Sequence, residues 1–157
     1  MQLKQLNILL ADDDLDDCIF FKDAVLELLP STNLTTVNDG EQLMNLLINE
    51  KTELPHVLFL DLNMPRKNGF ECLSEIKANE KLKLLPVIMF STSFEQDVVN
   101  QLYQNGAHYF IRKPSEFSQF KKIIQHTLNL LAQLLPGNEN ENITPSTREN
   151  FVLLLEK

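Results

Sequence analysis

Five short apolar runs recur along the chain, each followed by a segment with a helical pattern of apolar residues. The runs cover residues 6–11, 34–37, 57–60, 87–90 and 109–111. Such short, nearly continuous runs are typical of strands that helices cover on both faces, as in a parallel sheet. Their alternation with helices predicts an α/β fold built on five βα units.

The segments between the runs carry apolar residues three and four positions apart, which predicts amphipathic helices. Pro30 directly follows the first helical segment, and Gly106 follows the fourth, where a left-handed residue commonly ends a helix. The positions of proline and glycine therefore agree with the helix ends that the apolar spacing predicts. The predicted helices cover residues 15–29, 40–50, 69–80, 95–105 and 116–135.

The last helix is followed by Pro136 and Gly137, and then by a polar stretch at residues 138–142. We therefore expect one domain over residues 1–135 and a tail over 136–157. The apolar cluster at 151–155 predicts a short amphipathic helix over 146–155, with Ser146 or Thr147 as its N-cap. We expect this helix to fold back onto the domain rather than to form a dimer contact.

Composition restricts the partners and the location. The 157 residues carry a formal charge of −8, which opposes binding to nucleic acid or to anionic membranes. The first residues lack a secretory signal and no apolar run reaches membrane-spanning length, so we expect a cytoplasmic protein with protein partners. Cys18 and Cys72 lack metal-type spacing and are expected to be free thiols.

Polar residues follow the predicted strands, where the carboxyl ends of a parallel sheet gather functional groups. Three acidic residues that meet there, Asp12, Asp13 and Asp61, would repel one another unless a cation were bound. Oxygen ligands without Cys or His favour Mg²⁺ over Zn²⁺. Helix capping is the alternative for this acidic stretch, and it suffices to explain Asp14, Asp16 and Asp17.

Asp61 ends an apolar strand that has no structural need for a charge, which indicates a reactive carboxylate. A carboxylate can attack a phosphoryl group, and the charge that develops then needs a cation and a fixed positive side chain. Lys113 can supply the latter, with an ordinary solvated lysine as the alternative. Pro114 indicates a constrained turn there, for which a cis peptide bond is one option.

Ser91 follows the fourth run and can donate its hydroxyl to a phosphoryl oxygen. Its alternative is to cap the next helix, a role for which Thr92 and Ser93 are the better candidates.

Taken together, Asp12 and Asp13, Asp61 with Asn63, Pro65 and Gly69, then Ser91, and Lys113 with Pro114, closely resemble the receiver domain of two-component response regulators. The resemblance covers residues 6–135. It implies a flavodoxin-like, doubly wound sheet of five parallel strands in the order 2-1-3-4-5. It also implies that the first and fifth helices cover one face and the other three helices cover the opposite face.

The resemblance further implies a role for each matching residue. Asp61 would be the phosphoacceptor. Asp13 and Asp61 would bind Mg²⁺ directly, with Mn²⁺ as a substitute, and Asp12 would bind it through water. The backbone carbonyl of Asn63 would be another metal ligand, and Lys113 and Ser91 would contact the phosphoryl group.

Three departures from the commonest pattern of the family that the chain resembles bear on the signal: Ser91 stands in place of Thr, Thr92 in place of a small Ala, and Phe110 in place of Tyr. Phe110 stands where an aromatic residue switches position on phosphorylation. Thr92 replaces a small residue, and Asn63, Thr92 and Ser93 lie where phosphoryl lifetime is tuned. The responding face would comprise the fourth helix, the fifth strand and the fifth helix, with four candidate contact residues: Gln101, Tyr103, His108 and Phe120.

The function implied is that of a single-domain response regulator rather than an enzyme. A histidine kinase or a histidine phosphotransfer protein would phosphorylate it, and it would act on a downstream protein as a monomer or a phosphorylation-dependent dimer. One alternative is a receiver scaffold that is never phosphorylated. Another, a phosphatase of the haloacid-dehalogenase type, needs a general acid where Asn63 stands and a nucleophile after the first strand.

Overall fold

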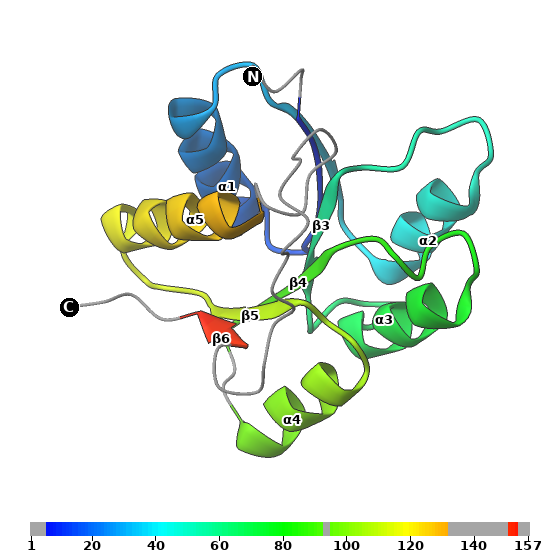
Figure 1. The fold of residues 1–157 in the computed structure, drawn as a ribbon. Helices are drawn as coiled ribbons and strands as arrows, with labels where there is room; N and C mark the ends of the chain where they lie inside the picture. Colours follow the sequence, from blue (N-terminus) through cyan, green and yellow to red (C-terminus); the bar gives the residue numbers. More distant parts are fainter. Residues whose placement is uncertain (1–5, 93–94, 132–150, 154–157) are drawn as a thin grey trace.

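The computed structural model describes residues 6–92, 95–131 and 151–153 of the chain, and in these residues strands and helices alternate (Figure 1). The bounds of most predicted elements are confirmed to within two residues. The elements are β1 (Asn7–Ala11), α1 (Leu15–Leu28), β2 (Asn33–Val37), α2 (Gly40–Ile48), β3 (Val57–Asp61), α3 (Gly69–Ala78), β4 (Val87–Ser91), α4 (Gln96–Gln104), β5 (Tyr109–Arg112), α5 (Phe117–Leu131) and β6 (Val152–Leu153).

All described strands are parallel, and they lie in the order β2-β1-β3-β4-β5-β6. The predicted order of the first five strands is therefore confirmed. The prediction of five strands is wrong, because β6 adds a sixth beyond β5.

The tail, where described, contradicts the predicted helix over 146–155. Phe151 and β6 are extended, and Val152 and Leu153 lie opposite Phe110 and Ile111 of β5. The Phe110 N–H donates to the Phe151 carbonyl at 2.9 Å. A strand prevails here because it satisfies backbone groups along β5 that a helix would leave unpaired. The rest of the predicted helix, the polar stretch and the end of the predicted fifth helix lie outside the described residues.

The sheet separates two layers of buried side chains, and Figure 1 shows α1 and α5 on one face with α2, α3 and α4 on the other. We call the first the α1/α5 layer; it contains Phe21, Phe59, Phe90 and Phe120. We call the second the α2–α4 layer; it contains Met44, Met64, Met89, Phe110 and Phe151.

Local chemistry fixes where helices begin and end. The Asp14 side chain accepts from the N–H groups of Asp16 and Asp17, so it is the N-cap of α1. Asn68 forms a capping box with Glu71 at the start of α3. Gly106 has a φ of 92° just after α4, which confirms the predicted left-handed position.

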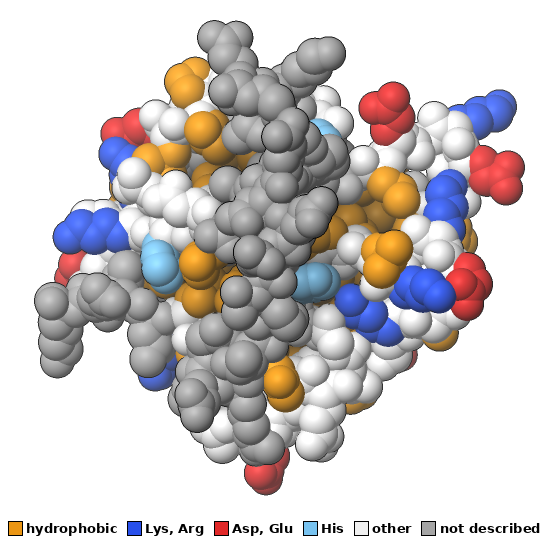
Figure 2. Space-filling view, viewed as in Figure 1, with side chains coloured by type: hydrophobic (Ala, Val, Ile, Leu, Met, Phe, Trp, Pro, Cys, Tyr) orange, Lys and Arg blue, Asp and Glu red, His pale blue; other side chains and the backbone are white. Residues whose placement is uncertain are grey.

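The surface charges and the free cysteines agree with the predicted α/β domain. Figure 2 shows charged side chains of both signs gathered over the α2 and α3 side, where Arg66 lies 3.5 Å from Glu41. Cys18 packs against the α1/α5 layer while Cys72 belongs to the α2–α4 layer, so the free thiols lie on opposite faces. Among the described residues, none of the helices combines the length and apolarity needed to cross a membrane.

Candidate functional site

Three carboxylates meet at the carboxyl end of the sheet. Asp12 directly follows β1, Asp13 comes next, and Asp61 is the last residue of β3. One carboxylate oxygen from each lies within 4.8 Å of the others. Asp12 and Asp61 are buried while Asp13 is exposed, so the group opens to solvent on one side. An all-oxygen set with one open side suits Mg²⁺, which keeps several water ligands.

The backbone holds Asp12 in place. Its N–H donates to the Val37 carbonyl at 3.0 Å, which extends the pairing of β1 with β2 by one residue. One side-chain oxygen, Oδ1, accepts from the Asp14 N–H at 2.9 Å. The second oxygen, Oδ2, accepts from Lys113 Nζ at 2.8 Å. Asp12 therefore connects the start of α1 to the end of β5.

Lys113 is the cation of the site, and its side chain is only 5% exposed. Its Nζ lies 3.6 Å from Asp61 Oδ1 and 5.2 Å from the centre of the Phe90 ring. Its N–H donates to the Ser91 carbonyl at 2.8 Å, which fixes the backbone. The described residues contain no cis peptide bond, so the cis option at Pro114 is wrong and the turn is trans.

Lys113 stays charged despite its burial. Burial acts to lower the pKa of its ammonium group, but hydrogen bonds to Asp12 and Asp17 and the charge of Asp61 act in the opposite direction. The balance raises the pKa above its ordinary value. The alternative of an ordinary solvated lysine is therefore wrong.

Asp61 lies in a setting that disfavours its charge. Burial, opposed in part by Lys113 and reinforced by Asp12, raises the pKa of Asp61 from 3.8 to about 7. The Asn63 N–H approaches Asp61 Oδ1 at 3.4 Å. A Cβ atom on Gly69 would collide with the Asp61 carbonyl, so α3 starts this close to β3 only with glycine there. A bound cation would favour the charged carboxylate.

The predicted switch residues lie on the other side of the sheet. Ser91 ends β4 fully buried, and its alternation with Phe90 turns its side chain toward the α2–α4 layer. Phe110 is also fully buried and belongs to that layer. Tyr109 faces the α1/α5 layer instead.

Phe110 borders a small cavity at this end of the sheet. The cavity has a volume of about 140 Å³, and Asn63 lies at its edge. The remaining lining residues are Leu62, Glu95, Val98 and Val99. Thr92 is exposed, whereas Ser93 lies outside the described residues.

Of the candidate contact residues on the predicted responding face, Phe120 is wrong because its side chain is buried in the α1/α5 layer.

Sequence reasoning missed Asp17, to which it gave only a capping role. The Asp17 side chain accepts from Lys113 Nζ at 2.8 Å, across 96 positions of sequence. The available signal was the position: Asp17 lies in the first turn of the helix that directly follows the acidic end of β1, so it stays near the carboxyl end of the sheet.

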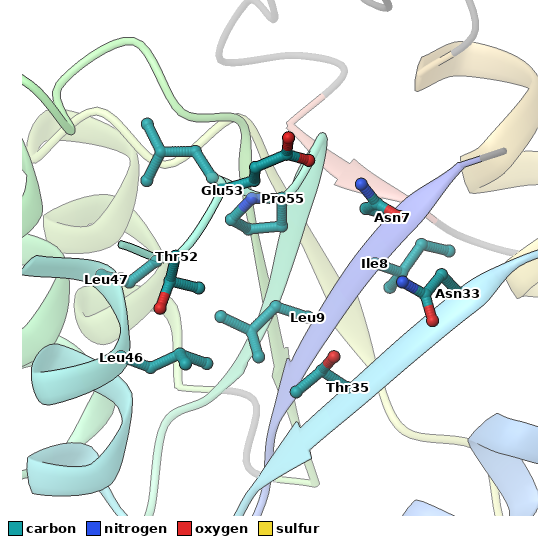
Figure 3. Close-up of a pocket in the computed structure, with 11 residues that line it drawn as sticks. Asn7, Ile8, Leu9, Asn33, Thr35, Leu46, Leu47, Thr52, Glu53 and Pro55 are labelled. Carbon is teal, nitrogen blue, oxygen red and sulfur yellow. The ribbon is translucent and has the colours of Figure 1, made fainter. Parts of the chain in front are cut away.

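A second cavity, of about 220 Å³, lies at the opposite end of the sheet (Figure 3). It is bordered by the first residues of β1 and β2, and Figure 3 shows Leu46 of α2 and Leu9 of β1 pointing toward one another. Glu53 is the one carboxylate among its lining residues. Among the described residues, the group of three acids that could hold a metal ion is therefore at the carboxyl end, not here.

The carboxyl-end arrangement can support transfer of an anionic group to a carboxylate. Asp61 offers an oxygen nucleophile, the neighbouring acids can hold a divalent cation, and Lys113 supplies a fixed positive charge. These are the components needed to form an acyl phosphate.

Comparison with known proteins points to one family. The family model described as the response regulator receiver domain matches residues 8–125. Response regulator Rcp1 of Synechocystis sp. is 30% identical over 122 residues, which cover 75% of this chain and 83% of that protein. The probable methanogenesis regulatory protein FilR2 of Methanothrix harundinacea is 35% identical over 72 residues, so the match spans about half of its length.

Solved structures show the same fold. The phosphorylated cyanobacterial phytochrome response regulator RcpA superposes with a TM-score of 0.79 at 28% identity, over 85% of this chain and all of that one. The Mn²⁺-bound form of response regulator Rcp1 gives a TM-score of 0.74 at 27% identity, over 90% of this chain and 99% of that one. Both of these proteins are response regulators by name.

Proposed function

The chain belongs to the response regulator receiver domain family, whose members are signalling proteins, and on that premise we propose that it is a single-domain response regulator phosphorylated on Asp61. The phosphoryl group comes from a histidine kinase or a histidine phosphotransfer protein. The observation that carries the proposal is the convergence of Asp12, Asp13 and Asp61 with the buried ammonium group of Lys113.

Asp13 and Asp61 hold Mg²⁺ directly in this proposal, Asp12 holds it through water, and the backbone carbonyl of Asn63 completes the protein ligands. Mn²⁺ is an acceptable substitute, in keeping with the Mn²⁺-bound relative. When bound, the cation neutralises part of the charge on the transferred group.

The chemical step is a displacement at phosphorus. An oxygen of the Asp61 carboxylate forms the new P–O bond as the P–N bond of the phosphohistidine breaks, and the departing imidazole takes up a proton. Lys113 binds a phosphoryl oxygen and keeps its own proton, because its pKa is raised. Ser91 lies one residue beyond the Asp61–Phe90 pair, at the carboxyl end of the sheet, and in this proposal its hydroxyl donates to another phosphoryl oxygen from there.

Phosphorylation then alters packing around Phe110. Ser91 and Phe110 share one side of the sheet, and the cavity of about 140 Å³ at Phe110 provides space for rearrangement. Asn63, Thr92 and Ser93 set how long the phosphoryl group lasts. The changed face binds a downstream protein, and the acidic chain avoids nucleic acid and membranes. Its cytoplasmic location, its state as a monomer or a phosphorylation-dependent dimer, and the domain limit at residue 135 remain predictions.

Intact-mass spectrometry tests this function. With acetyl phosphate and Mg²⁺, the wild-type protein should gain one phosphoryl group, and Asp61→Asn should gain none. Asp16→Asn removes the same charge from an exposed position of α1 and should leave the modification intact. Chelation of Mg²⁺ should prevent it. An unmodified wild-type protein under these conditions would favour the scaffold alternative.

A further inference from the structure

Lys113 is held by two carboxylates, and one of them lies outside the acidic cluster. Its Nζ is 2.8 Å from Asp12 Oδ2 and 2.8 Å from Asp17 Oδ2. Both distances are those of charge-assisted hydrogen bonds. Asp17 belongs to the first turn of α1, so it ties the end of β5 to that helix.

The ammonium group has three N–H donors, and the two carboxylates occupy two of them. Asp61 Oδ1, at 3.6 Å, is too distant for a hydrogen bond but close enough for charge attraction. Two fixed bonds therefore set the direction in which the third donor points. The next carboxylate oxygen near Nζ is that of Asp61, the residue that carries the phosphoryl group in the proposed function.

The two carboxylates that bind Lys113, those of Asp12 and Asp17, differ in their other contacts. Asp12 is part of the cluster that would surround a cation, and its other oxygen already accepts from the Asp14 N–H. Asp17 has no place in that cluster, and its side chain is 24% exposed. Its hold on Lys113 can persist whether or not a cation occupies the cluster.

We propose that Asp17 is a positioning residue: its carboxylate keeps the Lys113 ammonium group directed at Asp61 and so accelerates phosphoryl transfer. This inference rests on the proposed phosphorylation of Asp61. It adds a partner for Lys113 that lies outside the metal cluster and contacts neither the cation nor the phosphoryl group.

The neighbouring residue Asp16 provides a matched control. It carries the same charge in the same turn of α1, but it is exposed and has no contact with Lys113 among the ion pairs of the described residues. Loss of either carboxylate changes the net charge and the helix N-terminus alike. Only loss of Asp17 removes a bond to Lys113.

The test measures initial phosphorylation rates of the full chain at several acetyl phosphate concentrations, with saturating Mg²⁺. Asp17→Asn should lower the rate at saturating donor roughly tenfold, because small misplacements of a group that contacts the transition state are costly. Asp17→Glu should recover most of this loss. Asp16→Asn should stay within about twofold of wild type, as expected for an exposed charge.

Three measurements separate positioning from a loss of structure. Asp17→Asn should unfold at a lower temperature than Asp16→Asn, because the buried ammonium group loses a charge-assisted hydrogen bond, but both variants should be fully folded at the assay temperature. Mg²⁺ affinity by calorimetry should change alike in both. The side-chain ¹⁵N resonance of Lys113 in the unphosphorylated protein should broaden through faster proton exchange only in Asp17→Asn.

The outcomes distinguish this inference from the function on which it rests. If wild type is phosphorylated and the Asp17 and Asp16 variants have equal rates, Asp17 is not a positioning residue. A rate above wild type in Asp17→Asn would also overturn the proposal, because Asp17 would then withhold Lys113. If wild type itself is not phosphorylated, the proposed function fails, whatever the Lys113 resonance shows.

Discussion

The two layers of side chains on either face of the sheet differ in composition. In the α1/α5 layer, Phe21 lies 4.8 Å from Phe59 between ring centres, and Phe90 lies 5.4 Å from Phe120, both in edge-on arrangements. The α2–α4 layer instead contains three buried methionines and a cavity of about 140 Å³ beside Phe110. Edge-on rings fix one another, whereas methionine adapts to its neighbours.

The residues of the candidate site are likewise divided between the two sides of the sheet. Strand alternation puts Asp12 and Asp61 on the α1/α5 side, and Lys113 lies over the Phe90 ring. It puts Ser91 and Phe110 on the other side. The charged residues of the candidate site thus lie on the side with the ring contacts, and the residues proposed to move lie on the side with the cavity.

Removing one ring from each layer tests the difference between the layers with the largest expected effect on stability. Phe21 and Phe110 are both fully buried, but Phe21 contacts three other rings. We expect Phe21→Ala to lower the free energy of unfolding by about 4 kcal/mol and Phe110→Ala by about 3 kcal/mol. Urea unfolding measures both. Equal losses, or a larger loss for Phe110→Ala, would show that the layers do not differ in stiffness.

The buried charge of Asp61 should destabilise the α1/α5 side when no metal is present. Burial raises the pKa of Asp61 from 3.8 to about 7, so over that range the folded chain keeps a proton that the unfolded chain releases. Stability therefore falls as pH rises toward 7. With EDTA at pH 8, Asp61→Asn should be more stable than wild type by on the order of 2 kcal/mol.

Added Mg²⁺ should stabilise wild type and leave Asp61→Asn nearly unchanged, as measured by thermal unfolding. A wild-type protein whose stability rises between pH 5 and pH 7 in EDTA, relative to Asp61→Asn, would contradict the assigned direction.

The α2–α4 side should respond to pH in the opposite sense through His108. Burial, and then the charge of Lys77, lower the pKa of His108 from 6.5 to about 4. Between these values the unfolded chain binds a proton that the folded chain excludes, so stability falls as pH drops. The loss should be about 1 kcal/mol at pH 4.5, after allowance for partial exposure.

His108→Asn should remove this acid sensitivity, because an amide oxygen can replace Nδ1 as the acceptor for the Val87 N–H. His126→Asn, at an exposed position of α5, is the control and should retain the sensitivity. Urea unfolding at pH 7 and pH 4.5 measures both variants.

The smallest expected effect is on the phosphorylation rate, and it concerns Phe90 and Met89, neighbours on β4 that face opposite layers. Phe90→Leu removes the ring beneath Lys113 and should slow phosphorylation about threefold, the range of a cation–π contact of roughly 0.5–1 kcal/mol. Met89→Leu, on the other face, should leave the rate unchanged and cost less than about 1.5 kcal/mol of stability. Equal rates for the two variants would remove any role for the ring.

Much of this division could be predicted from the sequence, because the period of apolar residues and the positions of Pro30, Asp14 and Gly106 report local geometry. The ends of buried strands also indicate where Asp61 and Lys113 meet. Strand β6 could not be predicted, since the run at 151–155 is equally apolar in either periodicity and β6 depends on a distant partner, β5. Asp17 was missed for a similar reason: an acid in the first turn of a helix needs no further explanation, and its bond to Lys113 is a tertiary contact.

Strand β6 also covers the edge of the sheet beside β5. At one end the sheet stops at β2, a short strand whose residues include Asn33, Thr35 and Thr36 and are mostly exposed. Polar, short edge strands resist intermolecular pairing. At the other end the apolar strand β5 would be the edge without β6. We expect a chain truncated before Phe151 to offer the backbone groups of β5 for pairing with another chain, and therefore to aggregate more readily.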